Sequence, residues 1–182
     1  EANDAFGNAV ALSGDTLVTH ALNEDSNQTT ITNGTSSSSN NDSTNSGAVY
    51  VYTRSGTSWS QQAYIKASNN DANDNFGNQL DIDGDTIVAS AYDASNQTTI
   101  TNGTSSSSNN DNSHSGAVYV YTRSGTSWSQ EAYIKASNSE AMDFFGVSVS
   151  ISGDTLAVGS TGDDSNQTTI TTTSSSDNSE SV

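Results

Sequence analysis

The chain repeats itself, and a repeat of this length restricts the possible folds more than any other feature of the sequence. The segment 46–69 recurs as segment 115–138, an offset of 69 residues, with Gln62 against Glu131 as the single difference. A fixed period of this kind is the signature of an architecture built from copies of one supersecondary unit. We therefore expect two full units and one partial unit, at residues 1–69, 70–138 and 139–182.

The composition excludes several classes of partner. The 182 residues carry 21 acidic and 4 basic side chains, a formal charge of −17, so phosphate backbones and anionic membranes repel the chain. The sequence contains no run of roughly 18 apolar residues, the length that a membrane-spanning helix needs. The chain has no cysteine for a disulfide or a thiolate metal site. We expect no nucleic-acid partner and no membrane insertion.

Each unit alternates apolar and polar residues with the period of strands. Residues 10–18 place apolar side chains on both sides of a tight Ser-Gly-Asp turn, which is typical of a hairpin. A second hairpin begins with Val-Tyr-Val-Tyr at 49–52, turns at 54–57 and returns over 59–66. Between the hairpins, the polar segment 23–46 predicts a long loop, exposed or partly disordered. The pattern predicts an all-β fold of tandem four-stranded antiparallel propeller-type blades, about two and a half of them.

Three blocks of sequence carry a family resemblance. FGNAVALSGDTLV begins at Phe6, FGNQLDIDGDTIV at Phe76 and FGVSVSISGDTLAVGS at Phe145, and GAVYVY follows after a loop in the first two units. Together these blocks resemble FG-GAP repeats, the propeller repeats of integrin α-subunits and of many bacterial surface proteins. The resemblance implies that the FG segment is the innermost strand, the GAP segment the second, and the Val-Tyr-Val-Tyr hairpin the outer two. It also implies an extracellular or cell-surface protein of bacterial or other microbial type.

The resemblance further implies a calcium loop between the first and second strands. At this place the first and third units have only Ser-Gly-Asp, at 13–15 and 152–154, and this turn is too short for a cation that takes six or more oxygen ligands. The second unit has Asp81, Asp83 and Asp85 around a glycine, which form either a solvated acidic hairpin or a weak cation site. We expect no cofactor, with calcium at this cluster as the alternative.

The residues that could support catalysis are few. The two histidines, His20 and His114, do not recur in the other units, and no Gly-x-Ser-x-Gly elbow supports a nucleophilic serine. We therefore predict that the chain is not an enzyme. Trp59, Trp128 and the aromatic residues near them either stack on sugars or pack between neighbouring blades. We expect them to pack, because large side chains fill the space between the blades of a propeller.

The polar segments carry candidate glycosylation sites. Sequons of the Asn-x-Ser/Thr form recur in the same loop of each unit, beside runs of serine, so the segments are either glycosylated or plain polar spacers. The candidate asparagines are Asn27, Asn33, Asn41, Asn96, Asn102 and Asn166.

These features predict a non-enzymatic structural protein of the cell surface or extracellular space. Fewer than three units are too few for a closed propeller, so we expect the chain not to close one by itself. We expect its blades to meet neighbouring copies or adjacent repeats head to tail, in a fibre or array. The alternative is a ligand-binding adhesion module within a longer closed FG-GAP propeller. A binding face would vary from unit to unit, whereas the two full polar segments are nearly identical, so we favour a structural role.

Overall fold

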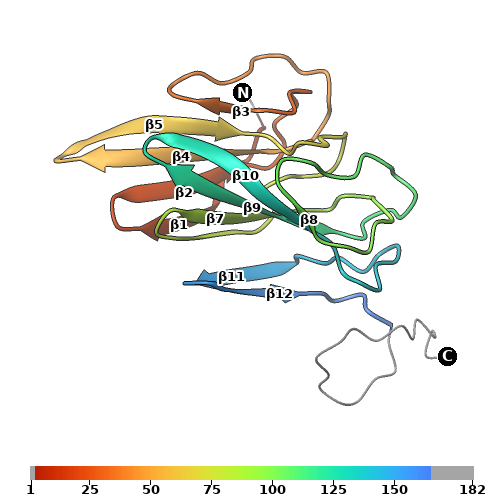
Figure 1. The fold of residues 1–182 in the computed structure, drawn as a ribbon. Coiled ribbons are helices and arrows are strands. Elements are labelled where there is room, and N and C mark those ends of the chain that lie inside the picture. Colours follow the sequence, from red (N-terminus) through yellow and green to blue (C-terminus); the bar gives the residue numbers. More distant parts are fainter. Residues whose placement is uncertain (1–2, 165–182) are drawn as a thin grey trace.

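All regular elements in the described part of the protein are β-strands, as the sequence predicts. The computed structural model describes residues 3–164, and within them twelve strands form two sheets of five strands and one of two. All pairings are antiparallel, and none of the three sheets closes into a barrel (Figure 1).

The first sheet has the spatial order β1-β2-β4-β5-β3. Both predicted hairpins are present: β1 turns into β2 through Gly14 and Asp15, and β4 turns into β5 through Gly56 and Thr57. The FG strand lies at one edge, and the strand and hairpin that follow it in sequence come next in space. The strands are β1 (Phe6–Ser13), β2 (Thr16–Ala21), β3 (Ile31–Asn33), β4 (Ala48–Ser55) and β5 (Ser58–Ile65).

The second sheet repeats this order as β6-β7-β9-β10-β8, and the third sheet is the hairpin β11-β12. The second sheet contains β6 (Leu80–Asp83), β7 (Thr86–Ala91), β8 (Thr101–Asn102), β9 (Ala117–Ser124) and β10 (Ser127–Ile134). The third contains β11 (Ser148–Ser152) and β12 (Thr155–Gly159).

The short strands β3 and β8 correct the prediction of four strands per sheet. They pair with β5 and β10, so the polar segment contributes to the sheet edge instead of forming only an exposed or partly disordered loop. Polar contacts hold it: Gln28 Nε2 donates to Thr32 Oγ1 over 2.7 Å, and Gln97 repeats this contact with Thr101. Such a segment lacks the apolar alternation that reveals a strand, which is why the pattern missed it.

A buried lysine anchors each polar segment to its sheet. Lys66 donates to Glu24 Oε2 and to Ser46 Oγ, both over 2.7 Å, and Lys135 lies 3.4 Å from Asp93 Oδ1. Burial lowers the pKa of both lysines, while the neighbouring carboxylates oppose that effect. Because a buried charge is tolerated only when it is paired, these contacts fix the segment against the end of the outer strand.

The sheets stack face to face, with the core between the first and the second. We call the face of the second sheet that carries Tyr119, Tyr121 and Trp128 its front face, the opposite side its back face, and use the same names for equivalent positions in the other sheets. All hairpin turns gather at one end of the molecule and the long polar segments at the other (Figure 1). The core joins the back of the first sheet to the front of the second through Val18, Val49, Val51, Ala63, Ile65, Ile82, Ile87, Ala89, Tyr119, Tyr121, Trp128 and Tyr133.

Candidate functional site: the faces of the sheets

Trp128 and Arg123 form the centre of the contact between the first two sheets. The indole N–H of Trp128 donates to Gln62 Oε1 over 2.9 Å, and Arg123 Nη1 donates to the same oxygen over 3.1 Å. The guanidinium carbon of Arg123 lies 5.1 Å from the centre of the Trp128 ring, within the range of a cation–π contact. The amide oxygen of Gln62 in the first sheet therefore accepts hydrogen bonds from both Trp128 and Arg123 of the second sheet.

A β-bulge aims Gln62 at this contact. The pairing of β4 with β5 shifts register between Val51 and Tyr52, which leaves Gln62 as the extra residue of β5. An extra residue re-aims its side chain relative to the regular alternation of the strand. In β10 the same bulge leaves Glu131 as the extra residue. The single difference between the two repeated segments thus falls on the bulge position, where Gln62 of the first sheet contacts the second sheet.

Two first-sheet side chains extend the contact. Asn33 exchanges two hydrogen bonds with the backbone of Trp128, accepting from its N–H over 2.8 Å and donating to its carbonyl over 3.3 Å. His20 is buried; its Nε2 accepts from Ala9 N over 3.0 Å, so we assign the proton to Nδ1, which donates to Gly77 O over 2.6 Å. His20 is therefore engaged in joining the sheets.

The two most repeated motifs meet across the boundary between units. Phe76 N donates to Ser46 O over 2.8 Å, and a Cβ on Gly47, whose φ is +81°, would overlap the backbone of Phe76. Gly116 approaches Phe145 in the same way. The glycine of GAVYVY is thus required by the FG pair of the following unit.

The candidate metal ligands Asp81, Asp83 and Asp85 bind separate partners. Asp81 Oδ2 accepts from Ile151 N over 2.9 Å and Asp83 Oδ2 from Gly153 N over 2.7 Å, both in the third sheet, whereas Asp85 pairs with an arginine of β9. In the described part of the chain, no group of three or more His, Cys, Asp or Glu side chains could hold a metal ion. The structure does not bring the three carboxylates together, and two of them fasten the third sheet to the second.

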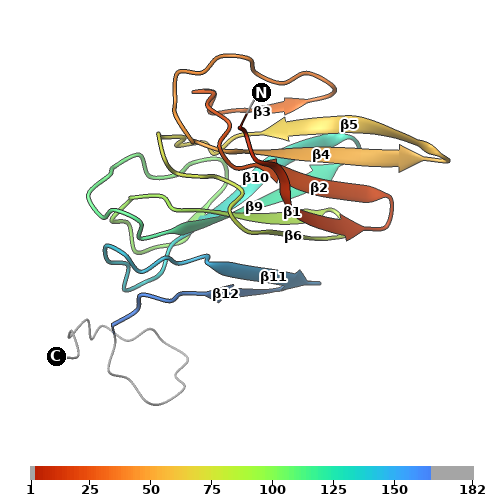
Figure 2. The ribbon, with the colours of Figure 1, turned by 180° about the vertical axis from the view of Figure 1, so that it is seen from behind.

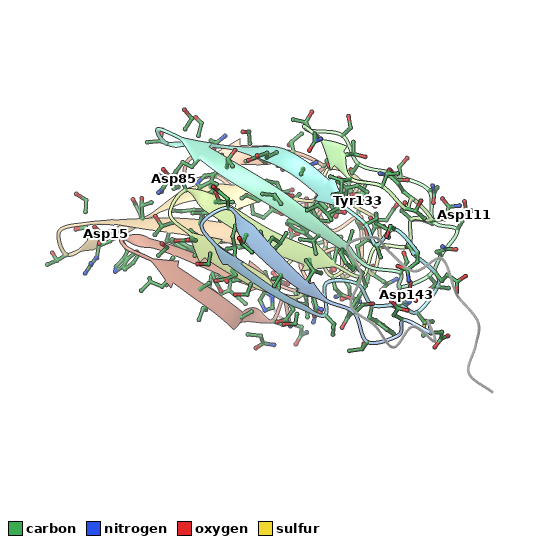
Figure 3. The ribbon with its side chains drawn as sticks, turned by 60° about the horizontal axis from the view of Figure 1, so that its bottom comes forward. Asp15, Asp85, Asp111, Tyr133 and Asp143 are labelled. Carbon is green, nitrogen blue, oxygen red and sulfur yellow. The ribbon has the colours of Figure 1, made fainter. Side chains whose placement is uncertain are left out.

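All four basic side chains of the sequence are paired with carboxylates. The two arginine pairs lie at the hairpin-turn end, where Figure 3 labels Asp15 and Asp85, and the two lysine pairs lie inside the protein near the long polar segments. The pairs are Arg54–Asp15 at 2.6 Å, Arg123–Asp85 at 2.5 Å, Lys66–Glu24 at 2.7 Å and Lys135–Asp93 at 3.4 Å. With 21 acidic residues against these four cations, the surface offered to a partner is strongly acidic.

Buried carboxylates gather near Lys135. Asp93 accepts hydrogen bonds from the hydroxyls of Tyr133 and Tyr119, over 3.1 and 3.2 Å, in addition to its contact with Lys135. Asp74 is also buried here, and its burial, together with the negative charge of Asp93, raises its pKa to about 7. We therefore expect Asp74 to lose its proton near neutral pH.

The front face of the first sheet is open. Figure 2 shows β1, β2 and β4 from this side with no other sheet in front of them. Of the four equivalent side chains of the second sheet, Phe76, Ile82 and Trp128 are at most 5% exposed, and Leu80 is partly buried. Four large apolar side chains of the first sheet are exposed to solvent: Phe6 by 56%, Val10 by 63%, Leu12 by 63% and Trp59 by 47%. The aromatic packing predicted from the sequence thus holds for Trp128 of the second sheet, whereas its counterpart Trp59 in the first sheet is exposed to solvent.

The candidate glycosylation sites differ in their surroundings. Asn33 is exposed but is bonded to the Trp128 backbone, and Asn166 lies outside the described residues. The other four are exposed on the polar segments: Asn27, Asn41, Asn96 and Asn102.

Neither Gln62, which joins the first two sheets, nor the buried lysines Lys66 and Lys135 were predicted from the sequence. One signal was present: in a chain with only four basic residues, all four stand at equivalent positions of two units. Such placement indicates specific partners, because basic residues that serve solubility would be scattered.

The repeated sheets with paired hairpins are those of a propeller-type repeat protein. The profile of the FG-GAP repeat family matches residues 1–52, 59–121 and 128–170, most of the chain. The chain therefore belongs to the FG-GAP repeat family. No curated protein and no solved structure matches it. In the described part of the chain no helix is long and apolar enough to cross a membrane.

The limits of the family matches do not coincide with those of the sheets. The match at 59–121 begins in β5 of the first sheet and ends in β9 of the second. It therefore contains both Gln62 and Tyr121, which lie on opposite sides of the sheet–sheet contact. This matched segment therefore spans the contact between the first two sheets.

Proposed function

We propose that this chain is a non-enzymatic structural module of an extracellular or cell-surface protein, and that it works by stacking its sheets on further FG-GAP sheets. The further sheets belong to neighbouring copies or adjacent repeats, arranged head to tail so that a front face meets a back face. FG-GAP repeats are generally non-enzymatic and typical of extracellular and surface proteins, which supports this function. The polar segments, on this proposal, carry glycans away from the stacked faces.

One observation carries the proposal: equivalent tryptophans of two units have opposite environments. Trp128 is 2% exposed against the first sheet, while Trp59 is 47% exposed on the open front face. Burying each large apolar side chain contributes about 1.5–3 kcal/mol, so the open face has a strong tendency to be covered.

The internal interface shows what covers such a face. Arg54 and Trp59 are stacked like Arg123 and Trp128, with the guanidinium carbon 5.7 Å from the centre of the ring. A sheet that docks on the open front face with a bulge side chain such as Gln62 would accept hydrogen bonds from both Arg54 and Trp59. The contact is heterologous, because front and back faces differ, and such contacts build rings or filaments.

Sedimentation velocity over a range of concentrations tests stacking between copies. We expect the chain to associate as its concentration rises, and Trp59→Ser to shift that association to much higher concentration. Ile100→Ser is the matched control, because Ile100 is 60% exposed but lies on a polar segment, away from the open face. Sedimentation as a monomer at every concentration would contradict stacking between copies.

A further inference from the structure

Lys135, Asp93 and Asp74 form a closed cluster inside the second unit. Lys135 Nζ lies 3.4 Å from Asp93 Oδ1, and all three residues are at most 6% exposed. The cluster joins three segments, because Asp93 follows β7, Lys135 follows β10 and Asp74 precedes the second FG pair. An amine thus touches one carboxyl group and lies near a second, in a place from which bulk water is excluded.

The equivalent lysine of the first unit is an ordinary ion-pair partner. Lys66 Nζ donates to Glu24 over 2.7 Å and to two further oxygens over 2.6 and 2.7 Å, which satisfies all three hydrogens of its ammonium group. In the second unit the acidic partner is Asp93, which is one methylene shorter than glutamate. Its contact with Lys135 is longer than a normal N–H···O hydrogen bond. Lys135 is therefore paired less closely than Lys66, although burial lowers the pKa of both.

Four donors polarise the carboxyl group of Asp93. Oδ1 accepts from Ser95 N over 2.7 Å and from the Tyr133 hydroxyl over 3.1 Å. Oδ2 accepts from the Tyr119 hydroxyl over 3.2 Å and from Asn69 Nδ2. Fixed donors on both oxygens would stabilise the negative charge that develops when a nucleophile adds to the carboxyl carbon.

Asp74 supplies an acid beside this pair. Burial, and then the negative charge of Asp93, raise its pKa to about 7, so its carboxyl group exists in both protonated and ionised forms near neutral pH. A group with such a pKa can give a proton and take one back at the same pH. Condensation of an amine with a carboxyl group needs both transfers, because one carboxyl oxygen leaves as water.

We propose that Lys135 and Asp93 join covalently in an amide bond, which makes this cluster a site of self-modification. The new bond joins Lys135 Nζ to Asp93 Cγ, and the bond from Cγ to one carboxyl oxygen breaks. The ammonium nitrogen gives up two protons and the departing oxygen takes up two, with Asp74 as the group that passes them. One molecule of water leaves, and no oxidant, reductant or further reactant is required.

Burial favours both the reaction and its product. A buried ion pair carries a large desolvation cost, and a neutral amide removes both charges. Holding the amine against the carboxyl group also makes the step intramolecular, an advantage equivalent to about 10⁵–10⁸ M of reactant in well-oriented cases. The bond would fix the start of the second polar segment to the end of β10, in a chain that has no cysteine for a disulfide.

Mass spectrometry of the intact chain, expressed without glycosylation and then denatured, tests the proposal. The chain should be lighter than its sequence by one water. Trypsin cleaves after the four basic residues, so digestion should release 67–123 joined to 124–182, with no cleavage after Lys135. Lys135→Arg should abolish the loss of water, whereas Lys66→Arg, at the equivalent position of the first unit, should retain it.

The rate of bond formation after refolding tests the part assigned to Asp74. Asp74→Asn should slow the reaction about a hundred-fold or more near neutral pH, because proton transfer by a positioned side chain contributes about 10²–10⁴-fold. Asp164→Asn, at an exposed position, should leave the rate unchanged. Circular dichroism establishes that both variants fold. A folded Asp74→Asn chain that reacts at the unaltered rate overturns the proton transfer through Asp74.

Two results overturn the bond itself. The first is a folded chain whose mass equals that of its sequence. The second is a loss of water that the tryptic peptides locate at Asp83, where the following glycine allows a backbone nitrogen to close a succinimide. Neither result bears on sheet stacking, because the proposed bond lies within one unit.

Discussion

Trp128 donates its indole N–H to Gln62 across the boundary between the first and second sheets. The bond joins a front face to a back face, and the bulge in β5 is what brings Gln62 to it. At the next boundary the bulge residue is Glu131, and at the open front face the tryptophan is Trp59. Both partners of this contact are present between the first two sheets, whereas among the described residues Glu131 and Trp59 each lack the opposite partner. We therefore infer that further sheets stack on these two faces.

The two tryptophans should differ in their effect on stability. Trp128→Ala should lower the free energy of unfolding by about 3–5 kcal/mol, because it removes a buried ring and leaves a cavity. Trp59→Ala, at the equivalent exposed position, should cost well under half as much at concentrations where the chain is monomeric. Urea denaturation measures both, and equal losses would show that the sheet–sheet contact does not stabilise the fold.

The glycines next to the FG pairs should be the least replaceable. Gly116 has φ of +84°, and a Cβ there would overlap the backbone of Phe145, so Gly116→Ala should destabilise the protein by clearly more than the backbone penalty alone. Gly125 has φ of +63° with open space around it, and Gly125→Ala should cost only about 1 kcal/mol. Thermal melting compares the two variants, and similar melting temperatures would argue against the close approach.

Stability should fall as the pH rises through 7 because of Asp74. Its pKa is about 7 in the folded protein against 3.8 as its ordinary value, so the folded state holds a proton that the unfolded state releases. The resulting stabilisation is full below about pH 3.8 and is lost as pH rises through about 7. Asp74→Asn should flatten the melting temperature between pH 5 and 8, whereas Asp164→Asn, at an exposed position, should keep the slope. An unchanged slope in Asp74→Asn would place the titration elsewhere.

Chelation should leave the fold intact. Asp81 and Asp83 accept from backbone N–H groups of the third sheet and therefore already have partners without a cation. The melting temperature with EDTA should equal that with added calcium. A large drop in the presence of EDTA would identify a cation site in the acidic clusters.

Glycan occupancy should differ between equivalent sequons. Asn33 Nδ2 donates to Trp128 O at the sheet boundary, so a glycan on this nitrogen would compete with that bond. Asn102, its counterpart in the second unit, is exposed. Glycopeptide mass spectrometry on protein from its native source should find Asn102 more occupied than Asn33. The reverse order, or the bare 18.8 kDa chain, would contradict this expectation.

The strands that alternate apolar and polar residues could be predicted from the sequence. The hairpins around Gly14 and Gly56 follow from tight turns between β-branched and aromatic residues, and the repeat places their copies. The strands β3 and β8 could not be predicted, because buried Lys66 and Lys135 and side-chain amides hold the polar segments in place. Those contacts join residues far apart in sequence and have no local period.

The contacts between the faces of the sheets were harder to predict from the sequence than the strands. Gln62 and Glu131 differ by one atom type in otherwise identical segments, and only the bulge shows that this position faces the next sheet. The Asp81, Asp83 and Asp85 cluster has the composition of a cation site, but the pairing of the third sheet directs two of the carboxylates to backbone donors. The composition therefore indicated an acidic cluster but not the backbone N–H groups that its carboxylates accept hydrogen bonds from.

The most direct test of sheet stacking is the structure of the assembled protein, determined by electron cryo-microscopy of material from its native source. The account predicts a further sheet about 10 Å from the front face of the first sheet, the usual spacing of packed sheets, with Trp59 bonded to a bulge side chain of that sheet. A first sheet whose front face, with Phe6, Leu12 and Trp59, remains open to solvent in the assembled protein would contradict it.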